Sequence, residues 1–140
     1  MKLHEKEKLI VAGLQETELL EFFTKINKDA QSIVYSSNLK ILGSPCEIYI
    51  FIEESIFNTI YFRISLINYK YSQCDLLNMI NKLNKESSFL IYFIDEDSIN
   101  AKLTYISTPD YFNAEAFCEL IILALQVLNL DYEEIITNLV

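Results

Sequence analysis

The sequence predicts an α+β fold in which helices pack on a single antiparallel sheet of about five strands. Three observations predict this class. Some segments show the alternating or continuous apolar pattern of strands, others repeat apolar residues every three or four positions as helices do, and short turns join neighbouring strands. The elements follow the order α-β-β-β-α-β-β-α. Because strands joined by short turns pair antiparallel, we expect one sheet covered by the helices.

The first helix is predicted from Thr17 onward. Thr17 can cap its N-terminus, while Lys25 and Lys28 lie where the negative end of the helix dipole would be. The apolar stripe of this helix comprises Leu19, Leu20, Phe23 and Ile26. Whether residues 9–14 extend the helix upstream stays open, because Gly13 disfavours a helical conformation.

Three strands are predicted next, over residues 32–42, 46–53 and 56–67. Residues 43–45, Gly-Ser-Pro, form the first turn, and residues 54–55 form a tight connection between the second and third strands. In the third strand we expect the even-numbered apolar residues to share one face of the sheet: Ile56, Ile60, Phe62, Ile64 and Leu66.

The middle helix is predicted over residues 72–85, with Ser72 and Asp75 placed as a capping box. Its buried stripe comprises Leu76, Met79, Ile80 and Leu83. Asn84 suits the end of this helix, because Asn tolerates the left-handed cap conformation. We expect Asn78 and Asn81 to be solvated.

A hairpin follows, with strands at residues 89–95 and 98–107. Its turn, residues 95–98, contains no glycine, so we expect a type I loop rather than a primed turn. Asn113 can cap the last helix, which is apolar almost all round from residue 117 to 130 and which we expect to continue through residues 131–140. Such a helix needs cover on several sides, which adds weight to self-association.

The chain of 140 residues shows no linker, repeat or low-complexity segment, so we expect residues 1–140 to form a single domain. Its formal net charge of −9 argues against nucleic-acid binding and against anionic membrane surfaces. An acidic chain is compatible with a basic partner and equally with simple solubility. Arg63 is the single arginine, so bidentate phosphate or carboxylate clamps are poorly supplied.

The three cysteines, Cys46, Cys74 and Cys118, are far apart and form no Cys-x-x-Cys pair, which disfavours a zinc or redox motif. An odd number of cysteines without a secretion signal predicts reduced thiols and a cytoplasmic location. The longest apolar stretch, residues 120–130, is interrupted by polar residues and is too short to span a bilayer.

The predicted sheet is apolar on both faces. We expect the helices to cover the face with Ile48, Ile50, Ile52, Ile60, Phe62, Ile64, Phe89, Ile91 and Phe93. The opposite face then carries Tyr49, Phe51, Phe57, Tyr61, Leu90, Tyr92 and Ile94. Two interpretations stay open: a helix or the N-terminal segment covers this second face, or it is a partner or dimer surface. The candidate residues for that surface are Tyr49, Phe51, Phe57, Tyr61 and Tyr92.

The sequence contains no recognisable catalytic set. His4 is the single histidine and lies in a charged terminus that we expect to be frayed and solvated. The acidic groups at 53–54 and 95–97 fall on predicted turns, where carboxylates are usually solvated. Cys74 lies near a helix start without a basic partner, so we expect a buried or half-buried thiol. We therefore predict no enzyme activity, no cofactor and no metal.

The order of elements resembles the type III secretion chaperone-like fold, and the YbjN family within it. The similarity is best over residues 76–136 and rests on Leu83, Asn84, Phe89, Tyr92, Asp95, Asp97, Tyr105 and Phe117. The chain departs from the family pattern in lacking glycine in the hairpin turn and before the last helix. The resemblance implies a non-enzymatic protein that is sensory or regulatory, or similar to secretion chaperones, which dimerise and hold extended segments of a partner.

Three functional classes follow. The first is a homodimeric, chaperone-like or regulatory domain that binds a protein or peptide. The second is an acidic immunity or inhibitor protein that neutralises a basic toxin or another basic partner, since the chain is small and acidic. The third is a small enzyme or ligand-binding domain, and the acidic groups on the predicted turns are the only feature that favours it.

Overall fold

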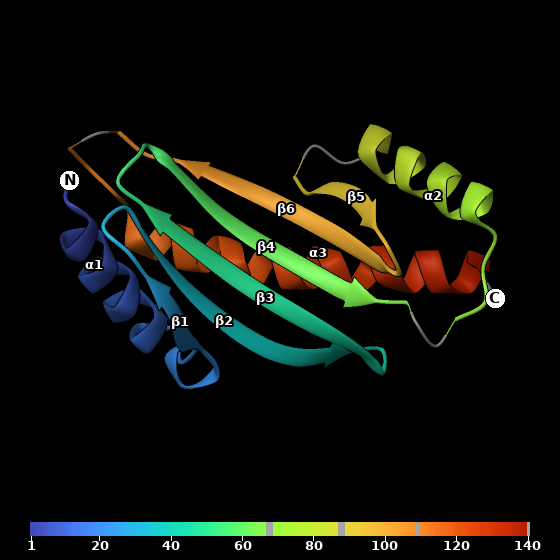
Figure 1. The fold of residues 1–140 in the computed structure, drawn as a ribbon, viewed down its shortest axis with the longest axis horizontal. Helices are drawn as coiled ribbons and strands as arrows, with labels where there is room; N and C mark the ends of the chain where they lie inside the picture. The colour runs from blue at the N-terminus through green and yellow to red at the C-terminus, as the bar shows by residue number, and fades with distance from the viewer. Residues whose placement is uncertain (67–68, 87–88, 109, 140) are drawn as a thin grey trace.

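The computed structural model describes residues 1–66, 69–86, 89–108 and 110–139. Within these residues, one antiparallel sheet of six strands lies against three helices and one 3-10 turn (Figure 1). The elements are α1 (Leu3–Glu16), η1 (Leu20–Phe22), β1 (Thr24–Lys28), β2 (Ser32–Ile41), β3 (Ser44–Glu53), β4 (Phe57–Ser65), α2 (Gln73–Glu86), β5 (Ile91–Asp95), β6 (Ser98–Ile106) and α3 (Ala114–Leu139). The strand order is β1-β2-β3-β4-β6-β5. The α+β class is confirmed, and the sheet has six strands rather than about five.

The N-terminal segment differs from the prediction. The helix expected from Thr17 onward is wrong, because α1 ends at Glu16 and Thr17 follows it, donating from both N and Oγ1 to the Gly13 carbonyl. Glu18 then adopts a positive φ of 61°, which an α-helix cannot accommodate. Residues 24–28 pair with β2 as the sixth strand, so tertiary pairing overrides the helical pattern of this segment.

The three middle strands are confirmed, with small shifts at their ends. Leu42 and Gly43 both have positive φ, 49° and 83°, as in a two-residue primed turn, so Ser44 and Pro45 already belong to β3 rather than to the turn. The predicted even-numbered residues of β4 are buried, except that Ile56 precedes the strand and is exposed. Ile67, the predicted end of that strand, lies outside the described residues.

The hairpin of β5 and β6 is confirmed, but its turn differs from the expected type I loop. Asp95 pairs with Ser98, which leaves Glu96 and Asp97 as a two-residue turn. Glu96 has a φ of 52°, and a positive φ at this position belongs to the primed turns. Primed turns match the right-handed twist of two tightly joined strands, and the twist imposes this conformation even without glycine.

The second and third helices are confirmed. Ser72 Oγ accepts a hydrogen bond from the Asp75 amide at the start of α2, and Asn113 Oδ1 accepts one from the Ala116 amide at 3.0 Å at the start of α3. The predicted stripe of α2 is buried, with Met79 half-buried. Asn84 lies inside α2, which ends at Glu86, rather than at its end. The predicted tail continues in α3 to Leu139, and Val140 lies outside the described residues.

The long helix α3 runs along one face of the sheet, and α1 and α2 lie near opposite ends of it (Figure 1). The core lies between this face and the helices, and its fully buried residues include Ile10, Leu14, Ile50, Phe62, Phe117 and Tyr132. Each such apolar side chain contributes about 1.5–3 kcal/mol through burial. Among the described residues, none of the helices combines the length and apolar character needed to cross a bilayer.

Candidate functional site

The two faces of the sheet have different environments. The helices pack on the inner face, which carries Ile48, Ile50, Ile60 and Phe62 at exposures of 2% or less. The opposite, outer face carries side chains that are mostly half-buried or exposed. Tyr49, Phe51, Phe57 and Tyr61 lie on the outer face, as the alternation of the sequence predicts. Two interpretations of this face were left open above. Among the described residues, no helix covers it.

Tyr92, the fifth predicted residue of this surface, is misplaced by the prediction. It is 2% exposed, lies on the inner face, and its hydroxyl donates to Asp131 Oδ2 on α3 at 2.5 Å. Leu90 and Ile94 also turn inward, whereas Ile91 and Phe93 lie on the outer face. Every residue from 89 to 94 is apolar or aromatic, so alternation does not reveal which set is buried. Pairing with β6 and contact with α2 and α3 decide it.

Four rings form a continuous row across the outer face, here called the aromatic row: Tyr49, Phe51, Tyr61 and Phe93. Neighbouring ring centroids are 6.2 Å apart for Tyr49 and Phe51, and 6.5 Å for Phe51 and Tyr61. Tyr61 and Phe93 meet at 5.6 Å with their planes 69° apart. Phe51 and Tyr61 also meet edge to face, with their planes 80° apart, whereas the planes of Tyr49 and Phe51 are tilted by 36°. Ring pairs at these distances attract each other. The row therefore presents a fixed apolar surface from β3 to β5.

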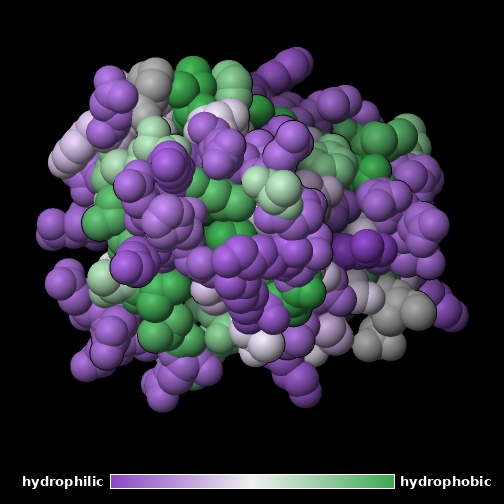
Figure 2. Space-filling view, turned by 60° about the vertical axis from the view of Figure 1, so that its left-hand side comes forward, coloured by the Kyte–Doolittle hydropathy of each residue, from purple (hydrophilic) through white to green (hydrophobic). Residues whose placement is uncertain are grey.

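Exposed apolar residues continue this surface at one end. Phe57 is 50% exposed and lies opposite Ile106, which is 62% exposed. On the side of the molecule shown in Figure 2, apolar patches are separated by hydrophilic side chains. Within the aromatic row, each ring contacts the next one along the row.

Charged and polar groups border the aromatic row. The Tyr49 hydroxyl donates to Glu47 Oε2 at 2.5 Å, and this hydrogen bond, followed by burial, raises the pKa of Tyr49. Arg63 lies opposite Glu47 in the register, and Lys102 lies opposite Tyr61. A shallow hollow lies beside them, lined by Pro45, Glu47, Arg63, Ser65, Glu96, Asp97 and Ser98. An apolar centre with a polar border is the usual anatomy of a protein–protein interface.

The predicted acidic groups lie on turns, as expected. Glu53 and Glu54 line an open hollow with Asp29, whose carboxylate accepts hydrogen bonds from the amides of Gln31 and Ser32 at 2.7 and 2.8 Å. Asp95, Glu96 and Asp97 surround the β5–β6 turn and are exposed. Among the described residues, no group of three or more His, Cys, Asp or Glu side chains is arranged to hold a metal ion.

The histidine and one cysteine differ from the prediction in their surroundings. His4 lies in the first turn of α1 rather than in a frayed end, and it is exposed. Cys74 is exposed rather than buried or half-buried, because the N-terminal turn of α2 faces solvent there. Cys46 and Cys118 are buried, and burial raises the pKa of their thiols to about 12 and about 11. Thiols with such pKa values stay protonated and unreactive at neutral pH.

A buried lysine that sequence reasoning missed connects α1 to the sheet. Lys6 is 2% exposed, and its Nζ donates to the carbonyl oxygens of Glu53 at 2.5 Å and Ser55 at 2.9 Å, and to Asn58 Oδ1 at 2.9 Å. Burial lowers the pKa of Lys6, against the opposing charges of Glu53 and Glu54. One signal was present in the sequence. Asn58 interrupts the even-numbered apolar positions of its strand, so its polar side chain is expected on the buried face, where it needs a hydrogen-bond partner.

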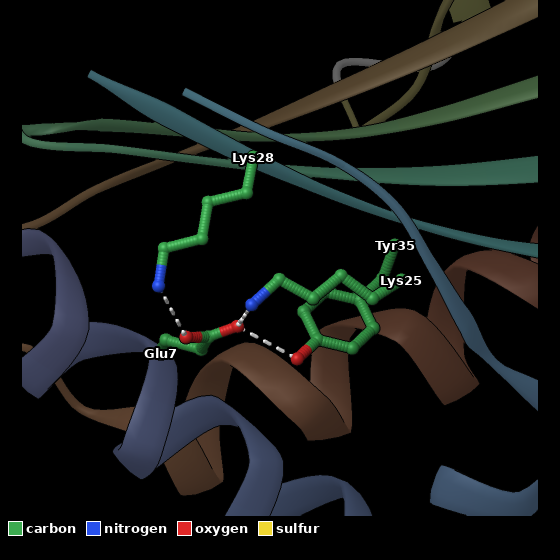
Figure 3. Close-up of polar contacts among 4 residues, drawn as sticks. All are labelled: Glu7, Lys25, Lys28 and Tyr35. Carbon is green, nitrogen blue, oxygen red and sulfur yellow. Dashed lines mark hydrogen bonds and ion pairs between the residues drawn. The ribbon is translucent and has the colours of Figure 1, made fainter. Parts of the chain in front are cut away.

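A second polar cluster joins α1 to the edge of the sheet (Figure 3). Glu7 Oε2 accepts a hydrogen bond from the Tyr35 hydroxyl at 2.8 Å and lies 2.7 Å from Lys25 Nζ, while Glu7 Oε1 lies 4.0 Å from Lys28 Nζ. Burial alone would raise the pKa of Glu7, but the hydrogen bonds from Lys25 and Tyr35 and the charges of both lysines outweigh it and lower that pKa. Burial and Glu7 raise the pKa of Tyr35 to about 12.

These features define an α+β protein with a helix-covered inner face, a bare aromatic outer face and two polar clusters that hold α1 to the sheet. No protein-family model, no curated protein and no solved structure matches the chain.

Proposed function

We propose that this chain is a non-enzymatic protein-binding domain of the chaperone-like or regulatory kind, whose outer face is its docking surface. The aromatic row is the observation that carries the proposal, because four rings, each in contact with the next, lie on a sheet face that the helices leave uncovered. Aromatic residues contribute most of the binding energy at many interfaces. The polar border set by Glu47, Arg63 and Lys102 supplies orientation rather than affinity.

The first partner that we propose is a second copy of the chain. A homodimer would bury the aromatic row together with Phe57 and Ile106, which are otherwise exposed. The similarity to the type III secretion chaperone-like fold supports this partner, since that resemblance implies dimers. If β1 is set aside, the helices and strands follow the α-β-β-β-α-β-β-α order of that fold.

Light scattering on the purified protein tests the proposal, with two variants for comparison. Replacing Tyr61 and Phe93 by serine removes the middle and one end of the aromatic row, and we expect the mass to fall from that of a dimer to that of a monomer. Leu130→Ser is the matched control, because Leu130 is 66% exposed on α3, away from the outer face. A wild-type protein that is monomeric at every concentration would contradict self-association.

A second candidate function is inhibition of a basic protein, such as a toxin. The net charge of −9 and the open hollow with Asp29, Glu53 and Glu54 favour it. Binding to a basic protein encoded beside this chain's gene, weakening as salt is added, is the expected result. Replacing Glu53 and Glu54 by glutamine should then slow association, whereas the Tyr61 and Phe93 substitutions test the aromatic row separately.

A further inference from the structure

Among the strands that the structure describes, the edge strand β1 alone has no buried or half-buried residue. All five of its residues, Thr24–Lys28, are exposed, so burial contributes little to its attachment. It pairs with β2 at four positions, and a bulge at Ile26 interrupts the register between Lys25 and Asn27. Strands with few buried contacts open at low free-energy cost.

One carboxylate provides the side-chain anchor for this strand. The bulge adds one residue to β1, so that Lys25 lies opposite Tyr35 and Lys28 lies opposite Ile33 on the same face of the sheet. Both lysines therefore reach Glu7 on α1, at 2.7 and 4.0 Å (Figure 3). Thus β1 occupies the edge of β2 as a short basic strand in an otherwise acidic chain.

The surface under β1 does not depend on β1 for its own order. Strand β2 pairs with β3 at ten positions, and Ile33 and Tyr35 are buried in the core. Glu7 is carried by α1, which Lys6, Ile10 and Leu14 fix against the sheet. If β1 moves away, the free backbone groups of β2 and the carboxylate of Glu7 stay in place, next to each other.

We propose that the edge of β2 beside Glu7 binds an extended, basic segment of another protein, and that β1 is the chain's own occupant, which such a segment displaces. Strand addition supplies main-chain hydrogen bonds, and Glu7 supplies the preference for cations. A regular strand would place its two cations two residues apart, opposite Tyr35 and Ile33, whereas a strand with the bulge of β1 would place them three apart. The proposal deepens the protein-binding function but does not use the outer face.

A reversible lock on β1 tests the proposal. Thr24 and Ser36 are direct partners, so Thr24→Cys with Ser36→Cys, in a Cys74→Ser background, can join β1 to β2 by a disulfide. The control joins two other directly paired strands of the outer face, through Thr59→Cys and Thr104→Cys. The probe is a labelled peptide with the sequence of residues 22–28, compared with the same peptide in which both lysines are glutamine.

We expect the oxidised Thr24–Ser36 lock to weaken binding of the lysine peptide by at least about tenfold and reductant to restore it, while the Thr59–Thr104 lock has no effect. The glutamine peptide should bind more weakly than the lysine peptide in every unlocked protein. Equal binding by locked and reduced proteins, equal binding of the two peptides, or no binding when the lock is open would each overturn the proposal.

Point variants give a second and independent readout. Lys25→Gln with Lys28→Gln weakens the occupant but leaves the site, so we expect tighter binding of the lysine peptide. Glu7→Gln added to this double variant removes the anion of the site when β1 has no ion pair left to lose, so we expect the lysine peptide to bind more weakly than to the double variant. Lys70→Gln with Lys85→Gln is the matched control for net charge, because both residues are exposed and lie outside the sheet. If the lysine substitutions and the Glu7 substitution both raised, or both lowered, the affinity for the lysine peptide, the assignment of β1 as occupant and Glu7 as the anion of the site would be contradicted.

The same lock distinguishes a peptide site from exchange of β1 between two copies. On a non-reducing gel, a cross-linked product of monomer size shows that β1 occupies its own chain. A product of dimer size would instead mean that a second copy fills the edge of β2, and that result would overturn the proposed partner. Failure of these experiments leaves the test of the aromatic row unaffected, because none of the changed residues belongs to it.

Discussion

The side-chain amide of Asn84 on α2 pairs with the main chain of Tyr92 on β5. Asn84 Nδ2 donates to the Tyr92 carbonyl oxygen at 2.9 Å, and Asn84 Oδ1 accepts from the Tyr92 amide at 2.8 Å. Strand β5 is the outermost strand at its side of the sheet, so these main-chain groups face away from β6. The amide thus takes the place of a neighbouring strand at one residue and closes part of an edge that is otherwise open to association.

We predict that Asn84→Ala destabilises the protein by about 1–2 kcal/mol, because two hydrogen bonds are lost. Asn81→Ala is the control, since Asn81 is an exposed residue of the same helix and loses the same atoms. Chemical denaturation of both variants measures the difference in unfolding free energy. Equal stabilities for the two would show that the pairing with Tyr92 contributes nothing.

The buried lysine of α1 should be needed for stability. Lys6→Met keeps much of the apolar stem but leaves three acceptors, on Glu53, Ser55 and Asn58, without their donor. We expect a loss of roughly 2 kcal/mol or more, because unsatisfied buried acceptors retain their desolvation cost. Lys8→Met, at an exposed position of the same helix, changes the charge equally and should have little effect on the denaturation midpoint.

The Glu7 cluster should make stability depend on pH in the acid range. The folded pKa of Glu7 lies below its ordinary value of 4.5, so its stabilising contribution is fully present above that value. The contribution is lost as the pH falls through the lower folded pKa, because the carboxylate must then take up a proton. We therefore expect Glu7→Gln to destabilise the protein at neutral pH, and much less once the pH has fallen below the lowered folded pKa of Glu7.

Unfolding curves of the wild type and Glu7→Gln across this pH range measure the effect. Glu16→Gln on the same helix is the comparison, because Glu16 is exposed. A difference between the wild type and Glu7→Gln that stays constant as the pH falls would argue against the ion pairs with Lys25 and Lys28.

Gly13 should be required by the contact between two helices. A Cβ at this position would lie 2.8 Å from Cys118 Sγ and 3.3 Å from the Ala114 carbonyl oxygen. Gly→Ala inside a helix normally stabilises by roughly 1 kcal/mol, but here we expect a net loss of about 1–3 kcal/mol from overpacking. Denaturation of Gly13→Ala, Cys118→Ala and the double variant forms a cycle. Removing Sγ should recover much of the loss, and strict additivity would contradict the contact.

The local sequence pattern alone predicted those helices and strands whose pattern fits only one type of secondary structure. The second and third strands alternate or run apolar between turn residues, and α2 and α3 have recognisable caps at Ser72 and Asn113. Four of the five residues predicted for the candidate surface lie on the outer face. They belong to strands between residues 49 and 61, in which the alternation of side chains shows which positions face outward. These features depend on residues close together in the chain, and periodicity reports them directly.

Tertiary structure decided the rest. The predicted helical stripe that begins at Leu19 reaches Ile26, yet residues 24–28 form a strand, because they pair with the edge of β2 and Lys25 contacts the carboxylate of Glu7. The inward direction of Tyr92 rather than Phe93 depends on β6 and Asp131, because an all-apolar strand shows no alternation. The partners of Lys6 lie 47 to 52 residues away. The sequence by itself thus determined an α+β protein with more apolar surface than one core needs. Only long-range contacts decided which surface stays uncovered and which strand has a single carboxylate as its side-chain anchor.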